Sequence, residues 1–211
     1  RMLEDILIFG DDLRCVGVLF CLYTGMRVGE MCALTWGDID LEEKTFSITK
    51  TLKRIMKTEG GKTLPGTKII IDKPKSVTSV RAVPFPDIVY RCLCAMVKNL
   101  PEWRRQPDQF VICSDNGMPY EPRTFERYFQ TLLKRAGLKD ASFHCLRHTF
   151  ATRAIELNIS AETLMSLLGH TDIGTTMRYV HALQEHKVKE VQKFDQIDRF
   201  TKSSERCLKR A

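Results

Sequence analysis

Strand-like alternation is concentrated in one part of this chain, and most of the rest is patterned as amphipathic helix. Helices are expected where apolar residues recur every three or four positions and a glycine, proline or serine marks an end. These segments are residues 11–23, 28–34, 86–100, 122–135, 144–157, 160–169, 175–181 and 183–200. A pair of strands joined by a turn at residues 42–44 is expected within residues 38–49, with further strands at residues 68–72 and 81–85 and a short extended stretch at residues 110–113.

This order of elements predicts an α+β fold that is mainly helical, with one small antiparallel sheet near the N-terminal third. Strands and helices do not alternate in the way that builds a parallel sheet. The sequence also lacks both glycine-rich phosphate-binding patterns, G-x-x-x-x-G-K-[ST] and G-x-G-x-x-G, so a nucleotide-binding α/β fold is not expected. With 211 residues, of which 43% are hydrophobic, the chain is long enough for one packed core.

The positive charge of the chain is concentrated in residues 50–81. The whole chain carries a net charge of +7, and this segment alone has nine Lys or Arg against two Asp or Glu. We interpret residues 51–67 as an extended basic hairpin that could contact a phosphate backbone. An ordinary solvated loop and an anionic membrane surface are the alternatives that charge alone leaves open. The candidate DNA-binding residues are Lys50, Lys53, Arg54, Lys57, Lys62, Lys73 and Arg81.

The cysteines indicate a cellular compartment. Eight cysteines are scattered along the chain without a C-x-x-C pair, and most lie in apolar runs. Buried free thiols of this kind are typical of a reducing cytoplasm, which is the expected location. No window of 18 apolar residues predicts a membrane span, and the first ten residues do not resemble a signal peptide. Because the chain begins at Arg1, we expect it to be a fragment of a longer protein.

Two clusters place an arginine where it could hold a phosphate. Arg27 follows a helix stop at Gly25, and Glu30 stands three residues later, close enough to orient the guanidinium group. His144 and Arg147 are also three residues apart, so both lie on one face of the expected helix. A histidine that exchanges a proton beside an arginine that binds a phosphate is a useful catalytic pair.

Three further residues have both an ordinary and a chemical interpretation. His148 lies four positions after His144, which is the spacing of a zinc-binding pair, but no acidic residue stands between them and a packing role is preferred. His170 follows Gly169, which can end a helix. Tyr179 is nine residues further on, and its phenol, with a pKa of about 10, needs nearby positive charge to act as a nucleophile. Spacing alone cannot assemble these residues into one site.

The order of the motifs resembles the tyrosine recombinase, or phage integrase, family. The matching stretches are TGMRVGE, a lysine in a strand–turn–strand, HCLRHTFAT, LLGH and TTMRY, and they span residues 11–180. The family contains phage integrases, Xer and Cre recombinases and the integrases of conjugative transposons, and KPKSVTSVRAVPF is most similar to the last group. The resemblance implies the catalytic-domain fold of this family and a site-specific recombinase that excises and integrates a mobile element.

The resemblance also implies which residues form the site. Glu30 would support the site from a second layer, and His148 would be mainly structural. The lysine of the site is expected to be Lys75, with Lys73 as the alternative. The implied catalytic residues are Arg27, Lys75, His144, Arg147, His170 and Tyr179.

In the implied mechanism, Tyr179 attacks a DNA phosphodiester, forms a 3′-phosphotyrosine and releases a 5′-hydroxyl. Arginine and histidine side chains stabilise the charge on the pentacoordinate phosphorus. His144 handles the tyrosine proton, and Lys75 protonates the leaving 5′-oxygen. Because the bond energy is kept in the phosphotyrosine, no ATP, metal ion or other cofactor is expected.

The resemblance implies double-stranded DNA as the partner, with a homo-tetramer assembled on it and an accessory excision or DNA-bending protein; no membrane partner is expected. Residues 1–182 are expected to be the catalytic domain, without the N-terminal DNA-clamping domain usual in the family. Residues 183–211 would form a C-terminal helix and tail. The apolar stripe of this helix could pack on its own domain or dock on a neighbouring protomer.

Three other functions are compatible with the sequence. One is an Xer-like resolvase that uses the same chemistry for another biological role. The second is a DNA-binding module without activity, against which the complete set of candidate residues argues. The third is a metal-dependent nuclease built on His144 and His148, which insensitivity to EDTA would exclude.

Overall fold

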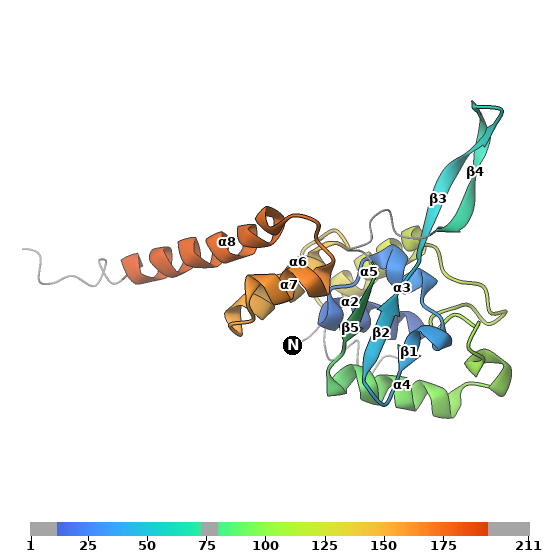
Figure 1. Ribbon diagram of the computed structural model, residues 1–211, viewed down its shortest axis with the longest axis horizontal. Coiled ribbons are helices and arrows are strands. Elements are labelled where there is room, and N and C mark those ends of the chain that lie inside the picture. Colours follow the sequence, from blue (N-terminus) through green and yellow to red (C-terminus); the bar gives the residue numbers. More distant parts are fainter. Residues whose placement is uncertain (1–11, 73–79, 194–211) are drawn as a thin grey trace, which may run out of the picture.

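The computed structural model describes residues 12–72 and 80–193. The described elements form a mainly helical body from which a β-hairpin and a long helix project in different directions (Figure 1). The helices are α2 (Leu13–Thr24), α3 (Val28–Ala33), α4 (Asp87–Asn99), α5 (Pro122–Arg135), α6 (Cys145–Glu156), α7 (Ala161–Leu168) and α8 (Ile173–Gln192). The strands are β1 (Ile39–Asp40), β2 (Thr45–Ile48), β3 (Thr51–Glu59), β4 (Lys62–Asp72) and β5 (Arg81–Pro84).

Helix α2 lies at the centre of the body, where it packs against α3, α4, α5 and α6. Its first turn is capped by Asp12, whose carboxylate accepts a hydrogen bond from the Arg14 amide, and it ends at Gly25 in the left-handed conformation (φ 67°). Apolar residues surround almost the whole helix, and its middle, including Phe20, is fully buried. A helix that is apolar on nearly every side needs neighbours on every side, which explains its central place.

The small sheet covers this core from one side. Its strands are antiparallel in the order β1-β2-β5, and Phe46 in β2 stands opposite Val83 in β5. The Phe46 ring is fully buried between Phe20 of α2 and Phe85, with ring centroids 5.5 and 4.5 Å away. The predicted α+β fold, mainly helical with a small antiparallel sheet, is thereby confirmed.

The prediction that residues 68–72 join this sheet is wrong. In the described residues β4 pairs with β3 alone, from Thr51 opposite Asp72 onward, and the two strands form a separate hairpin. Lys50, just before the hairpin, explains the break. Its ammonium group binds the Asp38 carboxylate at 2.9 Å and the Thr35 hydroxyl at 3.0 Å, which holds the chain to the body where the hairpin departs. The expected basic hairpin therefore exists and is longer than expected.

The end of the chain also differs from the prediction of two helices, at residues 175–181 and 183–200. Helix α8 runs without a break through Ala182, a residue that favours helix, and starts at the cap Asp172. Its first half packs on α6 and α7, whereas Val188 and Val191 in its second half are 56% and 66% exposed. The rest of the predicted apolar stripe lies at residues 194–200, outside the described residues.

Two structural observations concern the expected cellular location, one about the cysteines and one about membrane spans. Each cysteine in the described part of the chain has a free thiol, and Cys15, Cys21, Cys32 and Cys113 are buried. Over the same residues, no helix combines the length and the apolar character that crossing a membrane requires.

Gly29 lies where the body of the protein meets the base of the hairpin. A Cβ atom at this position of α3 would lie 2.7 Å from the Leu52 carbonyl oxygen and 2.7 Å from the Thr51 hydroxyl oxygen. The absence of a side chain thus lets β3 cross close to α3, and Leu52 is 1% exposed at this crossing. Because Gly29 stands between Arg27 and Glu30, the crossing adjoins two predicted site residues.

We predict that Gly29→Ala lowers the free energy of unfolding by about 1–3 kcal/mol, because the new methyl group would overlap a backbone oxygen that has little room to move. Helix propensity alone predicts the opposite sign, a gain of up to about 1 kcal/mol. Chemical denaturation of the two proteins measures the difference. A stability equal to or above that of the unmodified chain would contradict the role of close approach.

Candidate active site

Five of the six predicted catalytic residues line one pocket of about 650 Å³, together with His148. The pocket lies where the start of α3, the start of α6, the end of α7 and the first half of α8 meet. Among the described residues, the lining has three arginines and no carboxylate, so it is suited to a phosphate. Lys75 and its alternative Lys73 lie outside the described residues. The five predicted catalytic residues that line the pocket are Arg27, His144, Arg147, His170 and Tyr179.

Arg147 is the most deeply buried of the arginines that line the pocket, with 2% of the residue exposed. It donates hydrogen bonds to the carbonyl oxygens of Gly25 at 2.7 Å and of Leu168 at 2.6 Å. Burial, and after it the charge of Arg27, lowers the pKa of Arg147 to about 10, so the group stays charged at neutral pH. Two neutral carbonyls hold this cation without cancelling its charge, which leaves that charge for an anion.

Arg27 is held by Glu30. Nη1 of Arg27 donates to Oε1 of Glu30 at 2.9 Å, and the Arg27 backbone amide donates to Oε2 at 3.0 Å. Arg27 is 40% exposed while Glu30 is 4% exposed, so the arginine can meet a ligand and the carboxylate cannot. Burial raises the pKa of Glu30, but its bonds with Arg81 and Arg27 outweigh burial and bring the pKa below its ordinary value.

Arg81 is not the surface DNA contact that its charge predicted. Its side chain is 6% exposed, and its two terminal nitrogens donate to the two oxygens of Glu30 at 3.2 and 2.9 Å. Glu30 is therefore shared by two arginines, one inside the protein and one at the pocket. Two positive charges around one buried carboxylate keep it ionised and fix its direction.

Three consecutive carbonyl groups at the end of α7 accept hydrogen bonds from arginines. Helix α7 is capped by Ser160 at its start and ends in left-handed Gly169 (φ 62°), so these carbonyls lack helical partners. The negative end of a helix dipole favours cations at this place. The bonds run from Nε of Arg81 to Leu167 (2.7 Å), from Nη2 of Arg147 to Leu168 (2.6 Å) and from Nη2 of Arg27 to Gly169 (3.5 Å).

His170 is fixed by a residue that the sequence analysis missed. Nδ1 of His170 lies 2.9 Å from the hydroxyl oxygen of Thr176, which is fully buried. Burial, and then the charges of Arg147 and Arg27, lowers the pKa of His170 to about 4, so the ring is neutral at pH 7. With Nδ1 occupied, Nε2 is the nitrogen that remains for a phosphate oxygen. Thr176 stands within the TTMRY motif, but only the fold shows that it reaches the histidine.

The tyrosine hydroxyl contacts a different histidine from the one predicted. Oη of Tyr179 lies 2.8 Å from Nδ1 of His148, while the rings of His144 and His148 are nearly perpendicular, with 4.7 Å between the centroids. Burial, then His148 and Arg147, lowers the pKa of His144. Burial raises the pKa of Tyr179, and Arg147 and Arg178 oppose this shift. Arg178 also lines the pocket and was not predicted.

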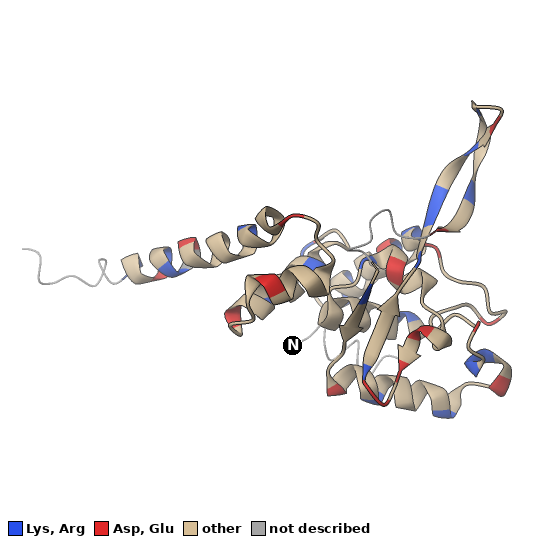
Figure 2. Cartoon of the chain, in the orientation of Figure 1, with Lys and Arg blue, Asp and Glu red and all other residues tan. Residues whose placement is uncertain are grey.

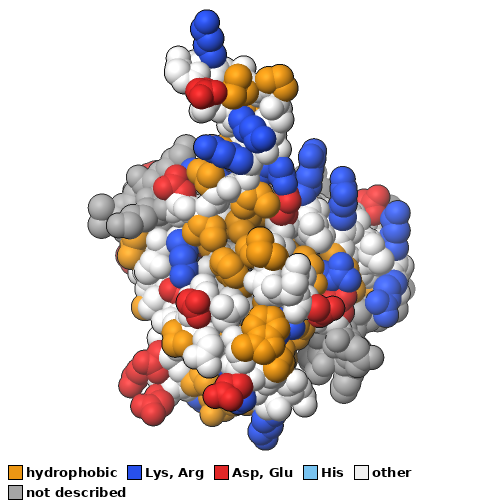
Figure 3. Space-filling model, turned by 90° about the vertical axis from the view of Figure 1, so that its right-hand side faces the viewer, with side chains coloured by type: hydrophobic (Ala, Val, Ile, Leu, Met, Phe, Trp, Pro, Cys, Tyr) orange, Lys and Arg blue, Asp and Glu red, His pale blue; other side chains and the backbone are white. Residues whose placement is uncertain are grey.

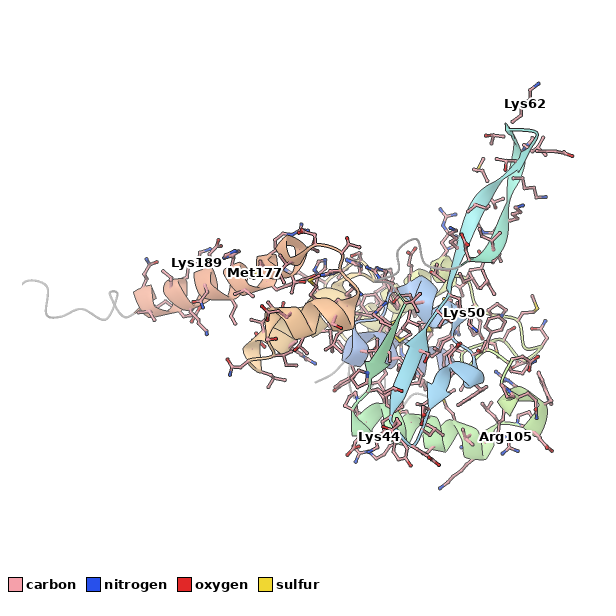
Figure 4. All side chains as sticks on the ribbon, in the orientation of Figure 1. Lys44, Lys50, Lys62, Arg105, Met177 and Lys189 are labelled. Atoms are coloured by element: carbon pink, nitrogen blue, oxygen red, sulfur yellow. The ribbon has the colours of Figure 1, made fainter. Side chains whose placement is uncertain are left out.

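The basic residues of the hairpin fall into two groups. Lys53 pairs with Asp72 at 2.8 Å and Arg54 with Glu121, so both are engaged within the protein. Lys57 and Lys62 are exposed toward the free end, and Figure 4 shows Lys62 at the tip. Blue basic segments follow both strands in Figure 2, and Figure 3 shows basic side chains on the hairpin and along the neighbouring upper edge of the body.

Sequence comparison finds relatives over most of the chain. A family model described as the phage integrase family matches residues 10–186. A XerC-like tyrosine recombinase of Caldanaerobacter subterraneus subsp. tengcongensis is 28% identical over 198 residues, covering 85% of this chain and 48% of that protein. An integrase of Staphylococcus phage L54a is 28% identical over 180 residues, with 82% and 49% covered. The chain thus spans about half the length of these curated relatives.

Solved structures share the fold. The integrase of the Tn1549 transposon, in complex with transposon right end DNA, superposes with a TM-score of 0.65 at 25% identity, covering 83% of this chain and 58% of that chain. The XerA recombinase gives a TM-score of 0.63 at 26% identity, with 90% and 61% covered. The architecture that the motifs implied is therefore the one observed.

We predict strong coupling between Glu30 and Arg81. Arg81→Met should lower the free energy of unfolding by about 3–5 kcal/mol, because it removes one partner of a buried ion pair. Combining it with Glu30→Gln should cost clearly less than the sum of the single changes, with a coupling energy above about 1 kcal/mol. Guanidinium unfolding of the four proteins measures this cycle.

The exposed pair Lys44–Asp87, with nitrogen and oxygen 2.7 Å apart, is the matched control. Lys44→Ala should change the free energy of unfolding by less than about 1 kcal/mol. Additive effects of Glu30→Gln and Arg81→Met would show that the two side chains act independently.

Proposed function

Because the chain belongs to the phage integrase family, we propose that it is the catalytic part of a site-specific recombinase. It cleaves and rejoins DNA strands through a 3′-phosphotyrosine intermediate. One observation carries the proposal: Tyr179 shares with Arg27, Arg147 and His170 a pocket to which the described part of the chain contributes no carboxylate. A nucleophile beside fixed cations is the arrangement that phosphoryl transfer requires, since the charge that develops on phosphorus must be stabilised in place.

In this proposal the scissile phosphate lies between the two arginines. Arg147 is fixed by backbone carbonyls and Arg27 by Glu30, so neither must reorganise when the phosphate arrives. His170, neutral and held by Thr176, donates from Nε2 to a phosphate oxygen. Double-stranded DNA is the substrate, and these residues act on its backbone without needing a metal ion or another cofactor.

The leaving 5′-oxygen needs a proton, which we assign to Lys75, with Lys73 as the alternative. Both residues lie outside the described part of the chain. A 5′-hydroxyl from another strand then attacks the phosphotyrosine and restores the phosphodiester. Cleavage and rejoining are thus the same step run in opposite directions.

We propose excision and integration of a mobile element as the biological role. The likeness to the Tn1549 transposon integrase, bound to transposon right end DNA, supports this role. An Xer-like resolvase with the same chemistry is the second candidate, favoured by the likeness to a XerC-like recombinase. Exchange between two element ends in a two-plasmid assay supports the first role, and exchange confined to a chromosomal dimer-resolution site supports the second.

We predict that the chain forms a covalent adduct with a nicked duplex that carries the element end, in the presence of EDTA. Cleavage near the nick releases a short fragment that carries the 5′-hydroxyl. Because this fragment diffuses away, the phosphotyrosine adduct accumulates and appears on a denaturing gel as a protease-sensitive band. Tyr179→Phe should abolish this band, because it lacks the attacking oxygen. An adduct that survives Tyr179→Phe, or that requires a divalent metal, would contradict the proposed chemistry.

The hairpin β3–β4 is proposed to contact DNA or a neighbouring protomer. Its basic residues provide charge for a phosphate backbone, whereas Met56 and Ile71 are 52% and 46% exposed and provide apolar surface for a protein. Lys57 and Lys62 are the DNA-contact candidates nearest its free end.

We predict that Lys57→Ala combined with Lys62→Ala weakens DNA binding and lowers the slope of log K against log salt by about 0.9 for each lost phosphate contact. Fluorescence anisotropy over a series of salt concentrations measures both values. Lys98→Ala with Arg105→Ala is the control, because it removes the same charge at the other end of the body, where Figure 4 shows Arg105. Equal effects of the two double changes would show that only net charge matters.

The C-terminal segment, residues 183–211, is proposed to dock on the next protomer of a tetramer on DNA. An accessory excision or DNA-bending protein is proposed to act in the same complex. The outer half of α8 projects from the body with Val188 and Val191 exposed (Figure 1). A mainly apolar pocket of about 410 Å³, whose lining includes Leu22, Phe150 and Leu157, offers a receiving surface between α2 and α6.

We predict that deleting residues 184–211 leaves adduct formation largely intact but removes the higher-order complex on DNA. Leu183 is retained because it packs on α6 and α7 within the same chain. Native gels and sedimentation with element-end DNA measure assembly, and the denaturing gel measures cleavage. Equal loss of both would indicate that the segment packs on its own domain.

A further inference from the structure

The hydrogen bond between Tyr179 and His148 points to a role that the family motifs did not give His148. We propose, on the basis of the function proposed above, that His148 is a catalytic residue. Its Nδ1 holds the Tyr179 hydroxyl and accepts its proton as the tyrosine attacks. This role replaces both the structural role expected for His148 and the proton-handling role expected for His144.

The geometry fixes both partners on packed helices. Nδ1 of His148 and Oη of Tyr179 are 2.8 Å apart, with ring centroids at 5.6 Å and an angle of 50° between the rings. His148 stands on α6 and Tyr179 on α8, and these helices pack against each other. The Tyr179 ring also packs against an apolar cluster that includes Ala151 and Leu164. The hydroxyl is therefore presented to His148 by the fold itself.

The other groups around the pocket are less suited to take this proton. Arg27, Arg147 and Arg178 have no acceptor nitrogen. His170 uses Nδ1 for Thr176. His144 lies beside the His148 ring, with 4.7 Å between the centroids and the rings nearly perpendicular, and its printed ring contact is with that histidine. Within the described residues, the contact of the tyrosine oxygen with an acceptor is the one to His148.

The proposed step balances its protons and bonds. Neutral His148 carries its proton on Nε2, so Nδ1 has a free lone pair that accepts from Oη. As Oη bonds to phosphorus, its proton passes to Nδ1, the bond from phosphorus to the 5′-oxygen breaks, and the general acid, Lys75 in our assignment, protonates that oxygen. In religation the imidazolium returns the proton to the tyrosine oxygen as the phosphotyrosine bond breaks. Burial keeps the Tyr179 hydroxyl protonated at neutral pH, so the step requires an acceptor.

The experiment compares His148→Ala and His148→Asn with the unmodified chain. Asn carries a polar atom close to the position of Nδ1 but its amide cannot accept a proton as imidazole does, so it separates holding the hydroxyl from accepting its proton. The substrate is the nicked element-end duplex with a bridging 5′-phosphorothiolate, whose thiolate leaves without protonation. The rate of adduct formation then reports on the tyrosine side of the reaction.

We expect His148→Ala to slow adduct formation by about 10²–10⁴-fold, the usual contribution of a positioned proton acceptor, even on the phosphorothiolate. His148→Asn should be faster than His148→Ala, because its amide can still hold the hydroxyl, and slower than the unmodified chain, because it cannot take the proton. If His144→Asn slows adduct formation on the phosphorothiolate to this extent and His148→Asn leaves the rate unchanged, His144 is the acceptor and the proposal is overturned.

A second readout needs no DNA. In ¹⁵N NMR spectra, the His148 ring should be in the tautomer with the proton on Nε2, and Tyr179→Phe should shift the Nδ1 resonance because it removes the hydrogen bond. Unchanged Nδ1 and Nε2 resonances in Tyr179→Phe would overturn the proposal whatever the chain does to DNA. An unmodified chain that shows the bond but forms no adduct would contradict the recombinase function instead.

Discussion

The carbonyl end of α7 is the point on which the site depends. Three successive carbonyls, of Leu167, Leu168 and Gly169, each accept from a different arginine, and two of those arginines line the pocket. A helix end supplies negative partial charge without a formal charge, so it can gather cations without neutralising them. Glu30 adds the one carboxylate of the cluster, placed behind the arginines and away from the ligand. The result is a cationic surface whose arginines are held in place by the protein itself.

Much of the fold was predictable because its signals are local. Asp12 and Ser160 cap helices through their own side chains, and Gly25 and Gly169 end helices in a conformation that glycine adopts easily. The hairpin itself was predicted, but its separation from the sheet was not, because alternation indicates a strand and not the strand with which it pairs. Its independence comes from tertiary contacts, namely Lys50 bound to the body and Gly29 beneath the crossing strand.

The site, like the fold, has a part that could be predicted from the sequence and a part that could not. The motifs identified the candidate catalytic residues that line the pocket, since each motif carries a distinctive residue at a fixed spacing. The supporting contacts could not be obtained from spacing, because they join distant segments. Arg81 has the charge of a surface residue and the burial of a core residue, and only its pairing with Glu30 explains this. Thr176 and His148 stand within recognised motifs, yet their partners are visible only after α6 and α8 pack together.

Because α8 is unbroken, the nucleophile and the exposed apolar residues lie on the same rigid helix. Tyr179 lies in its packed half and Val188 in its exposed half, and nine helical residues separate them by about 14 Å. A helix without a hinge moves as one body, so its outer end and the Tyr179 side chain keep a fixed relative position. A neighbour docked on the outer half, as proposed above, would therefore be held at a fixed distance from the nucleophile.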